Sequence, residues 1–313
     1  MNPFFIIGPT ASGKSAAALA LAERTGGEIV NADAFQLYQG MDLLTAKPSK
    51  ADRSRVRHHL YDVLPLTENC DAQRYREMAV RVIEDIEARG RLAIVVGGSG
   101  LYIKALSHGL AEVPRADPRV RARLSHLSLG EKVAWLLLRD VRAAETVALR
   151  NPRYVERALE ICLLTGRPQS ELRQSFETTP PQGQGVVLQW DREILYQRIN
   201  QRVLDMMTEG LLDEVCSLRQ GGANAEKAIG LREMRAHLAG NMTLKEAVAA
   251  MQTATRQYAK RQTTWFKRER WLQTICLDSE AAAESVANQI LDLFPCLLPS
   301  RPPKRTRSRS LLV

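Results

Sequence analysis

The chain carries a short segment that could bind a chain of phosphates. Residues 8–15, Gly-Pro-Thr-Ala-Ser-Gly-Lys-Ser, match the pattern G-x-x-x-x-G-K-[ST]. Backbone N–H groups at the start of a helix can cradle phosphate, the Lys14 ammonium can neutralise it, and the Ser15 hydroxyl can ligate Mg²⁺. The segment follows the apolar residues 4–7 and precedes an Ala- and Leu-rich stretch. It therefore stands between a predicted strand and a predicted helix, as this mechanism requires.

Two further polar side chains are expected beside this loop. ATP- and GTP-using enzymes with such a loop normally carry a carboxylate at the end of a later strand, but the apolar run at 92–96 ends in Gly-Gly-Ser-Gly, with Ser99. The carboxylate is Asp33, just past the strand predicted at 28–32. Because parallel strands end at one edge of a sheet, Asp33 and Ser99 should lie together. They suggest a base acting on a second substrate, whereas a helix cap or a metal ligand is the plainer interpretation of Asp33.

The elements that must position these residues alternate between strand and helix. Asp71 can cap a helix at 71–90, and residues 92–96 are apolar throughout, which is typical of a strand buried on both faces. Past Pro114 the pattern is helical, at 119–129, 133–148 and 154–165. The predicted fold class is α/β, with a P-loop NTPase-like parallel sheet core and an all-helical insertion domain.

The expected domain boundaries follow from this change of pattern. The first part of the core takes residues 1–114, the helical insertion 115–181, and the second part of the core, with long C-terminal helices, 182–298. Apolar residues 186–188 predict a return to the sheet, followed by a helix at 194–209. A long helix is predicted at 244–271. Its apolar face carries Leu244, Val248, Met251, Tyr258 and Trp265, and the opposite, cationic face carries Arg256, Lys260 and Lys267. Residues 299–313 read as a disordered basic tail.

Composition excludes several classes of protein. The 313 residues are 45% apolar and 25% charged, as in a soluble globular protein. The net charge is +9, and five of the positive charges lie in the last thirteen residues. The five cysteines are widely spaced, which supports neither a disulfide framework nor a zinc site, and His58 and His59 are interpreted as structural. No apolar run fits a signal peptide or a membrane span, so we expect a cytoplasmic protein that contacts no membrane.

Seven segments together resemble the tRNA dimethylallyltransferases, also called tRNA isopentenyltransferases or the IPP transferase family. They run in family order from about Pro3 to Asp278. The segments are residues 8–15, 31–42 with Thr45-Ala46-Lys47-Pro48, His58-His59-Leu60, 97–102, Arg157-Ala158-Leu159-Glu160, Ala228-Ile229-Gly230 and 259–266. The set is much more specific than the phosphate loop alone.

The resemblance implies an activity and a set of roles. A dimethylallyl group would pass from dimethylallyl diphosphate to N6 of adenine 37 in the anticodon stem-loop of tRNA, with Mg²⁺ as cofactor and Ser15 as its ligand. Asp33 would be the general base, and Ser99 stands where the family has a threonine that orients the amine. The diphosphate would be held by Gly8, Thr10, Ala11, Ser12, Gly13, Lys14, Ser15 and Arg202, and the tRNA by Asp33, Ala34, Phe35, Gln36, Ser99 and Arg121.

Some residues gain a physical rationale from this comparison. The departing diphosphate is stabilised by concentrated positive charge, which Lys14 and Arg202 would supply. The Gln36 amide can read an adenine edge bidentately, and the cationic face of the long helix could track RNA. The sequence departs from the family pattern at Ala34, Leu44, Tyr154 and Leu231, which puts substrate detail and rate in question.

Three alternatives remain open at this stage. A small-molecule isopentenyltransferase that prenylates free adenine nucleotides would need no insertion domain. A P-loop NTP-dependent kinase is disfavoured by the missing carboxylate after residues 92–96. A catalytically weak relative that binds RNA is suggested by Tyr154 and Ala34. A monomer is expected.

The missing carboxylate generates a testable prediction about nucleotide choice. The protein should bind dimethylallyl diphosphate more tightly than ATP, because nothing at residues 92–96 organises γ-phosphate chemistry. Competition binding and a phosphate-release assay with and without tRNA measure this. Strong tRNA-dependent phosphate release from ATP would instead favour a motor or a kinase.

Overall fold

The computed structural model describes residues 1–110, 113–172, 180–278 and 281–298, so the predicted tail at 299–313 lies outside the described residues. The chain forms two compact units. One comprises residues 1–106 together with the chain from 182 onward, and the other comprises residues 107–181. No helix within the described ranges is long and apolar enough to span a membrane.

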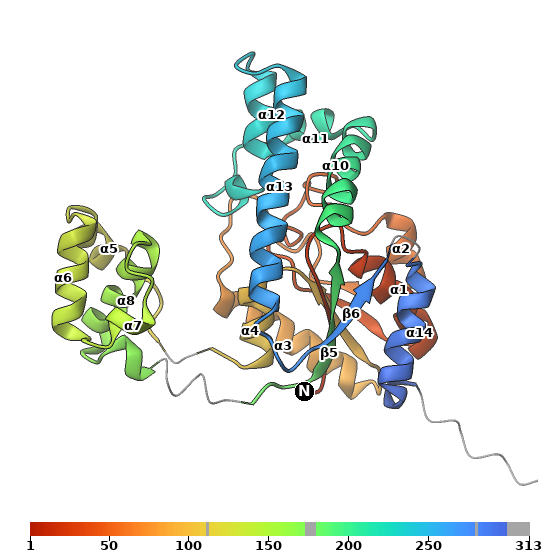
Figure 1. Cartoon of the computed structure of the whole chain (residues 1–313), viewed down its shortest axis with the longest axis horizontal. Helices are drawn as coiled ribbons and strands as arrows, with labels where there is room; N and C mark the ends of the chain where they lie inside the picture. The colour runs from red at the N-terminus through yellow and green to blue at the C-terminus, as the bar shows by residue number, and fades with distance from the viewer. Residues whose placement is uncertain (111–112, 173–179, 279–280, 299–313) are drawn as a thin grey trace, which may run out of the picture. The chain divides into compact units, whose positions relative to one another are not determined.

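The larger unit is built on a six-stranded sheet whose paired strands are all parallel (Figure 1). The strand order is β3-β2-β4-β1-β5-β6. The strands are β1 (Phe4–Ile7), β2 (Glu28–Asn31), β3 (His58–His59), β4 (Ala93–Gly97), β5 (Gln184–Trp190) and β6 (Gln273–Leu277). The predicted parallel α/β sheet is confirmed, and the return of the chain to it at 186–188 is β5.

Helices surround this sheet in the larger unit. They are α1 (Lys14–Thr25), α2 (Lys50–Arg55), α3 (Ala72–Ala88), α4 (Gly100–Ser107), α10 (Arg192–Thr208), α11 (Leu211–Ser217), α12 (Leu231–Leu238), α13 (Leu244–Phe266) and α14 (Ala283–Leu293), with short 3₁₀ turns at Ala225–Lys227 and Pro295–Leu297. The smaller unit contains α5 (Pro118–Ser125), α6 (Leu129–Arg139), α7 (Ala143–Thr146) and α8 (Pro152–Thr165). It has a core of its own around Leu124, Leu136 and Leu159.

The continuous apolar character of the strands follows from two hydrophobic cores, one on each face. Alternate residues of β1 point to opposite sides, so that Phe5 and Ile7 join one core while Phe4 and Ile6 join the other. All four side chains are essentially inaccessible to solvent. A strand with a core on both faces cannot show polar alternation, which is why residues 92–96 read as apolar throughout.

Two predicted helices have different bounds in the structure. The stretch 133–148 is not one helix: α6 ends at Arg139 and α7 is a separate turn. The break falls at Asp140, a buried carboxylate that accepts hydrogen bonds from the Ser170 backbone N–H at 2.8 Å and from its hydroxyl at 2.6 Å. The helix predicted at 244–271 begins correctly, with Thr243 as its N-cap, but ends at Phe266. Residues 273–277 instead form the edge strand β6.

The predicted apolar face of α13 is partly confirmed, because Met251 is buried and Val248 and Trp265 pack against the core. Leu244 is 40% exposed, whereas Ala247, Ala259 and Gln262 are buried. The buried side of the helix therefore includes small residues and one amide beside Met251 and Phe266.

The buried Glu28 at the start of β2 generates a stability prediction. Its carboxylate bonds Arg89 and lies 2.8 Å from His59 Nε2. The Arg89 hydrogen bond lowers the pKa of Glu28 to about 2, against the opposing effect of burial. The ionised group therefore stabilises the fold above about pH 4.5, and that stability is lost as the pH falls toward 2.

Glu28→Gln should lower the free energy of unfolding at pH 7 by roughly 3 kcal/mol and should flatten its acid dependence. Denaturant titrations between pH 2 and 7 measure both effects. Glu84→Gln, at an exposed position of α3, is the matched control. Identical acid dependence in the wild type and Glu28→Gln would contradict the assignment.

Candidate active site

The phosphate loop is the connection from β1 to α1. Gly13 is the N-cap of α1 and has a φ of 84°, a left-handed conformation that favours glycine. The loop is fixed from β5 and α10: Trp190 Nε1 donates to the Ser12 carbonyl at 2.9 Å, and Arg198 Nε donates to the Ala11 carbonyl at 3.0 Å. Arg198 also stacks over Trp190, 4.3 Å from the ring centroid. Arg198 therefore braces the loop.

A cleft rich in cations lies over this loop. Its lining includes Thr10, Ala11, Ser12, Gly13, Lys14, Ser15, Asp33, Gln36, Arg198 and Arg202. Burial lowers the pKa of Lys14 to about 8, with Asp33 opposing the shift and Arg202 adding to it. The same cause, burial, lowers the pKa of Arg202. Concentrated positive charge of this kind suits a polyanion. Gly8 lies beneath the loop, where an added Cβ would come within 2.8 Å of the Ser12 hydroxyl.

Asp33 stands where the sequence places it, just beyond β2 and in the cleft. Its Oδ1 accepts a hydrogen bond from the Phe35 N–H at 3.0 Å. Ser99 is near, but it does not line the cleft: its hydroxyl accepts the Ala34 N–H at 2.9 Å. Ser99 thus holds the backbone next to Asp33 in place.

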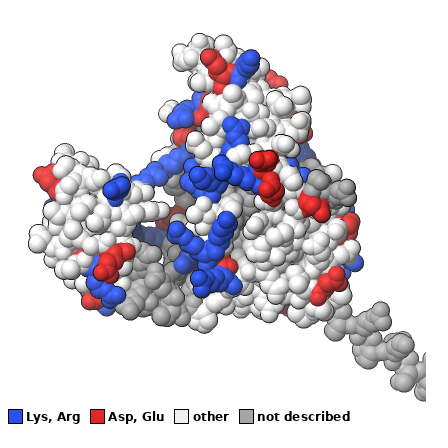
Figure 2. All heavy atoms as spheres, viewed as in Figure 1, with Lys and Arg blue, Asp and Glu red and all other residues white. Residues whose placement is uncertain are grey.

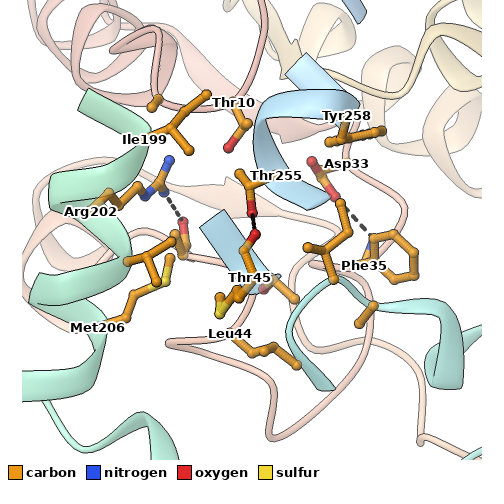
Figure 3. Close-up of a pocket in the computed structure, with 16 residues that line it drawn as sticks. Thr10, Asp33, Phe35, Leu44, Thr45, Ile199, Arg202, Met206, Thr255 and Tyr258 are labelled. Carbon is orange, nitrogen blue, oxygen red and sulfur yellow. Dashed lines mark hydrogen bonds between the residues drawn. The ribbon is translucent and has the colours of Figure 1, made fainter. Parts of the chain in front are cut away.

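An apolar cavity opens from the same cleft (Figure 3). The two share Thr10, Asp33 and Arg202 among their lining residues. Figure 3 shows Arg202 and Asp33 on opposite sides of the cavity, with Thr10 nearby and Met206 farther along the α10 side. The apolar lining includes Leu44, Ile199, Val203, Met206, Ile229 and Met251. The cavity thus has one charged end and one apolar end.

These apolar residues were not predicted from the sequence. Ile199, Val203 and Met206 follow helical spacing with Arg202 on α10, and that spacing was the one available signal. Thr255 and Tyr258 of α13 complete the wall (Figure 3).

The expectation for Gln36 needs correction. Its Nε2 donates to the carbonyls of Thr45 at 2.9 Å and Ala46 at 3.1 Å. The donors of this amide are thus used to brace the segment that forms one wall of the cleft. Reading an adenine edge bidentately needs a donor and an acceptor together, so Gln36 as placed cannot do so.

Arg121 lies on α5, in the smaller unit. Its guanidinium meets the buried Glu160 carboxylate, with Nε 3.1 Å from Oε1, and Arg157 bonds the same carboxylate. Glu160 also accepts the Asp117 N–H at 2.8 Å. Arg121 therefore helps to neutralise a buried charge. If Arg121 also contacts RNA, it does so in addition to this structural role.

The cationic face predicted on the long helix is partly confirmed. Arg256 is instead bound to Asn200 Oδ1 at 2.5 Å. Exposed cations follow at the C-terminal end of α13 and just past it, and Figure 2 shows blue side chains gathered over this part of the molecule. They are Lys260, Arg261, Lys267, Arg268 and Arg270.

The cleft can be tested for a fit to Mg²⁺. The described residues contain no group of three His, Cys, Asp or Glu side chains that could enclose a metal. The cleft does offer the Ser15 hydroxyl and the Asp33 carboxylate. Mg²⁺ commonly takes one or two protein ligands together with substrate phosphates, so these residues fit a metal that arrives with a diphosphate.

A parallel sheet, a glycine loop at a helix N-terminus and a cationic cleft at the strand ends are the features of a P-loop enzyme, with a cleft that suits a phosphorylated ligand. The chain belongs to the IPP transferase family, whose model matches residues 36–269.

Curated relatives and solved structures agree with this family. The chain is 43% identical to a tRNA dimethylallyltransferase of Akkermansia muciniphila over 92% of this chain and 98% of that protein. It is 44% identical to one of Geobacter metallireducens over 92% and 96%. A eukaryotic dimethylallyltransferase described as acting on tRNA aligns with a TM-score of 0.81 and 25% identity, over 97% of this chain and 82% of that one.

The four residues that differ from the family pattern lie in different parts of the structure. Leu44 lines the apolar cavity and Leu231 is buried at the start of α12. Ala34 donates its N–H to Ser99, and Tyr154 is 60% exposed in the smaller unit. Leu44 is therefore the departure placed to affect the shape of the cavity.

The lowered pKa of Lys14 predicts that replacing this lysine has opposite effects on stability and on diphosphate affinity. A lysine whose pKa falls from 10.5 to about 8 destabilises the ligand-free fold while protonated, and this cost disappears as the pH rises from 8 to 10.5. Lys14→Met should thus raise the free energy of unfolding at pH 7 by about 1–3 kcal/mol. It should also weaken inorganic diphosphate binding by about tenfold or more.

Thermal unfolding and calorimetric titration measure the two effects. Lys50→Met, at the exposed first turn of α2, is the control and should change neither quantity much. A variant at Lys14 that loses stability yet keeps its affinity for diphosphate would contradict the assignment.

Proposed function

We propose that this protein transfers a dimethylallyl group from dimethylallyl diphosphate to N6 of adenine 37 in the anticodon loop of tRNA. The observation that supports this best is the joined cavity. Its cationic end around Lys14 and Arg202 suits a diphosphate, and its apolar end around Met206 and Met251 suits a short branched hydrocarbon.

The proposed chemistry begins with the allylic C–O bond. As that bond breaks, its electron pair leaves with the diphosphate oxygen, and positive charge spreads over the allyl group. Lys14, Arg202 and the loop amides stabilise the departing charge. Mg²⁺ bound with the diphosphate would add positive charge there, with Ser15 as the protein ligand.

The acceptor amine then forms the new C–N bond. N6 supplies the electron pair, and its proton passes to the Asp33 carboxylate. Asp33 lies between the cationic end and Tyr258, within the shared part of the cavity (Figure 3). Ser99 acts through the Ala34 backbone, which its hydroxyl holds.

The tRNA would be held by phosphate contacts outside the cavity. The exposed cations at the end of α13, Lys260, Arg261 and Lys267, are suited to an RNA backbone. Arg121, Phe35 and Ala34 remain proposed tRNA contacts. Because the adenine is stacked in the loop, it must leave the stack to reach Asp33. We also propose that the protein acts in the cytoplasm as a monomer.

The other candidates have weaker support. An NTP-dependent kinase has no use for the apolar end of the cavity. A free-nucleotide prenyltransferase does not account for a separate helical unit at residues 107–181.

Substitution of Asp33 tests the proposed chemistry. Asp33→Asn should lower prenyl transfer by about 10²–10⁴-fold, because the amide cannot accept the N6 proton. Binding of dimethylallyl diphosphate should stay close to wild type, since the loop provides the phosphate contacts. Mass spectrometry of tRNA nucleosides after single-turnover incubation measures the transfer.

Asp71→Asn is a useful control, since it changes a carboxylate that caps α3 away from the cleft. Wild-type turnover by Asp33→Asn would assign Asp33 to structure alone. Absence of prenylated adenosine with the wild-type protein would contradict the proposed function itself.

A further inference from the structure

Gln262 is a buried amide that joins α13 to the phosphate loop. Only 4% of the residue is exposed. Its Oε1 accepts the Thr10 N–H at 2.9 Å, and its Nε2 donates to the Gly98 carbonyl at 2.9 Å. One side chain thus bridges the loop that follows β1 and the segment that follows β4.

The residue at position 98 has to be small for this bridge to form. A Cβ added to Gly98 would lie 2.2 Å from Gln262 Nε2. The glycine is therefore explained by the close approach of an amide from α13.

The bridge ends at a residue that lines both proposed substrate regions. Thr10 lines the cationic cleft and the apolar cavity (Figure 3). By holding the Thr10 N–H, Gln262 fixes the loop at the point where the diphosphate end meets the hydrocarbon end. The other loop anchors, Trp190 and Arg198, come from β5 and α10.

The same helix carries exposed cations next to the bridge. Lys260 and Arg261 precede Gln262, and Lys267 caps the helix five residues later. Figure 2 shows cationic side chains gathered over this end of α13. RNA phosphates bound there would restrain α13, and Gln262 links α13 directly to Thr10. When RNA binding changes the position of α13 and so of Thr10, the two affinities are coupled, and linkage makes that coupling reciprocal.

We propose that Gln262 is a positioning residue that couples RNA binding on the cationic end of α13 to the geometry of the diphosphate cleft. The inference rests on the proposed function, because it takes tRNA as the occupant of that surface. It adds a residue that touches neither reacting group and acts through the Thr10 backbone.

The test titrates the full chain with inorganic diphosphate, with and without a saturating anticodon stem-loop RNA. The wild type should bind diphosphate at least about fivefold more tightly with RNA present. Gln262→Met should bring that ratio close to one. In steady state its kcat should fall about 10–100-fold while KM for the RNA changes little, because misplacement of the loop affects alignment rather than RNA contact.

Gln252→Met is the matched control. Gln252 is also a glutamine of α13, and its Nε2 donates to the Asn200 carbonyl at 3.1 Å, away from the loop. This variant loses one similar hydrogen bond and should keep both the coupling ratio and kcat. Loss of coupling in both variants would assign the effect to the stability of α13 and overturn the proposal.

The outcomes separate this inference from the proposed function. A wild type that prenylates tRNA but shows no coupling, or a Gln262→Met variant that keeps it, overturns the inference alone. If Gln262→Met does not fold, Gln262→Asn decides, because its amide is one methylene shorter and cannot reach Thr10 and Gly98 together. A coupling ratio below the wild-type value in that variant supports the proposal, and a wild-type ratio overturns it. Absence of prenyl transfer in the wild type counts against the proposed function, and the diphosphate titration still decides the coupling.

Discussion

Holding several cations together before any phosphate arrives is the constraint that shapes the larger unit. Lys14, Arg198 and Arg202 line one cleft, where they repel one another and lose hydration. The fold offsets this with Asp33, with the stacking of Arg198 on Trp190, and with backbone carbonyls that accept from these side chains. A bound diphosphate relieves the repulsion, so the same arrangement that strains the empty fold favours the ligand.

The wall opposite the phosphate loop is built by side chains that stabilise backbone. Gln36 donates to the carbonyls at 45 and 46, and the Glu214 carboxylate accepts the N–H groups of residues 42, 43 and 44. Lys47 is buried, with its ammonium 2.7 Å from Asp42 and bonded to the Tyr38 carbonyl at 2.6 Å. Several residues that carry the family resemblance therefore shape the wall of the cleft through their hydrogen bonds.

The position of α13 unites these features. It closes the apolar cavity with Met251, Thr255 and Tyr258, and it reaches the phosphate loop through Gln262. Because its C-terminal end is also strongly cationic, one helix contacts each region that the proposed reaction requires.

The sequence by itself determined the phosphate loop, the parallel sheet and the placement of Asp33 at its edge. These are local properties: Gly13 and Lys14 act through their own backbone and helix, and strands buried on both faces are apolar at every position. Only the tertiary structure decided which polar side chains are bonded within the fold and which can contact a ligand. Gln36 bonds a carbonyl nine residues away, and Arg121 and Arg256 bond partners on other helices. The type of a side chain does not show which partner the fold will give it. The apolar cavity was equally hidden, because Ile199 and Met206 have the spacing of ordinary core residues, and only the packing of α10 and α13 leaves space between them.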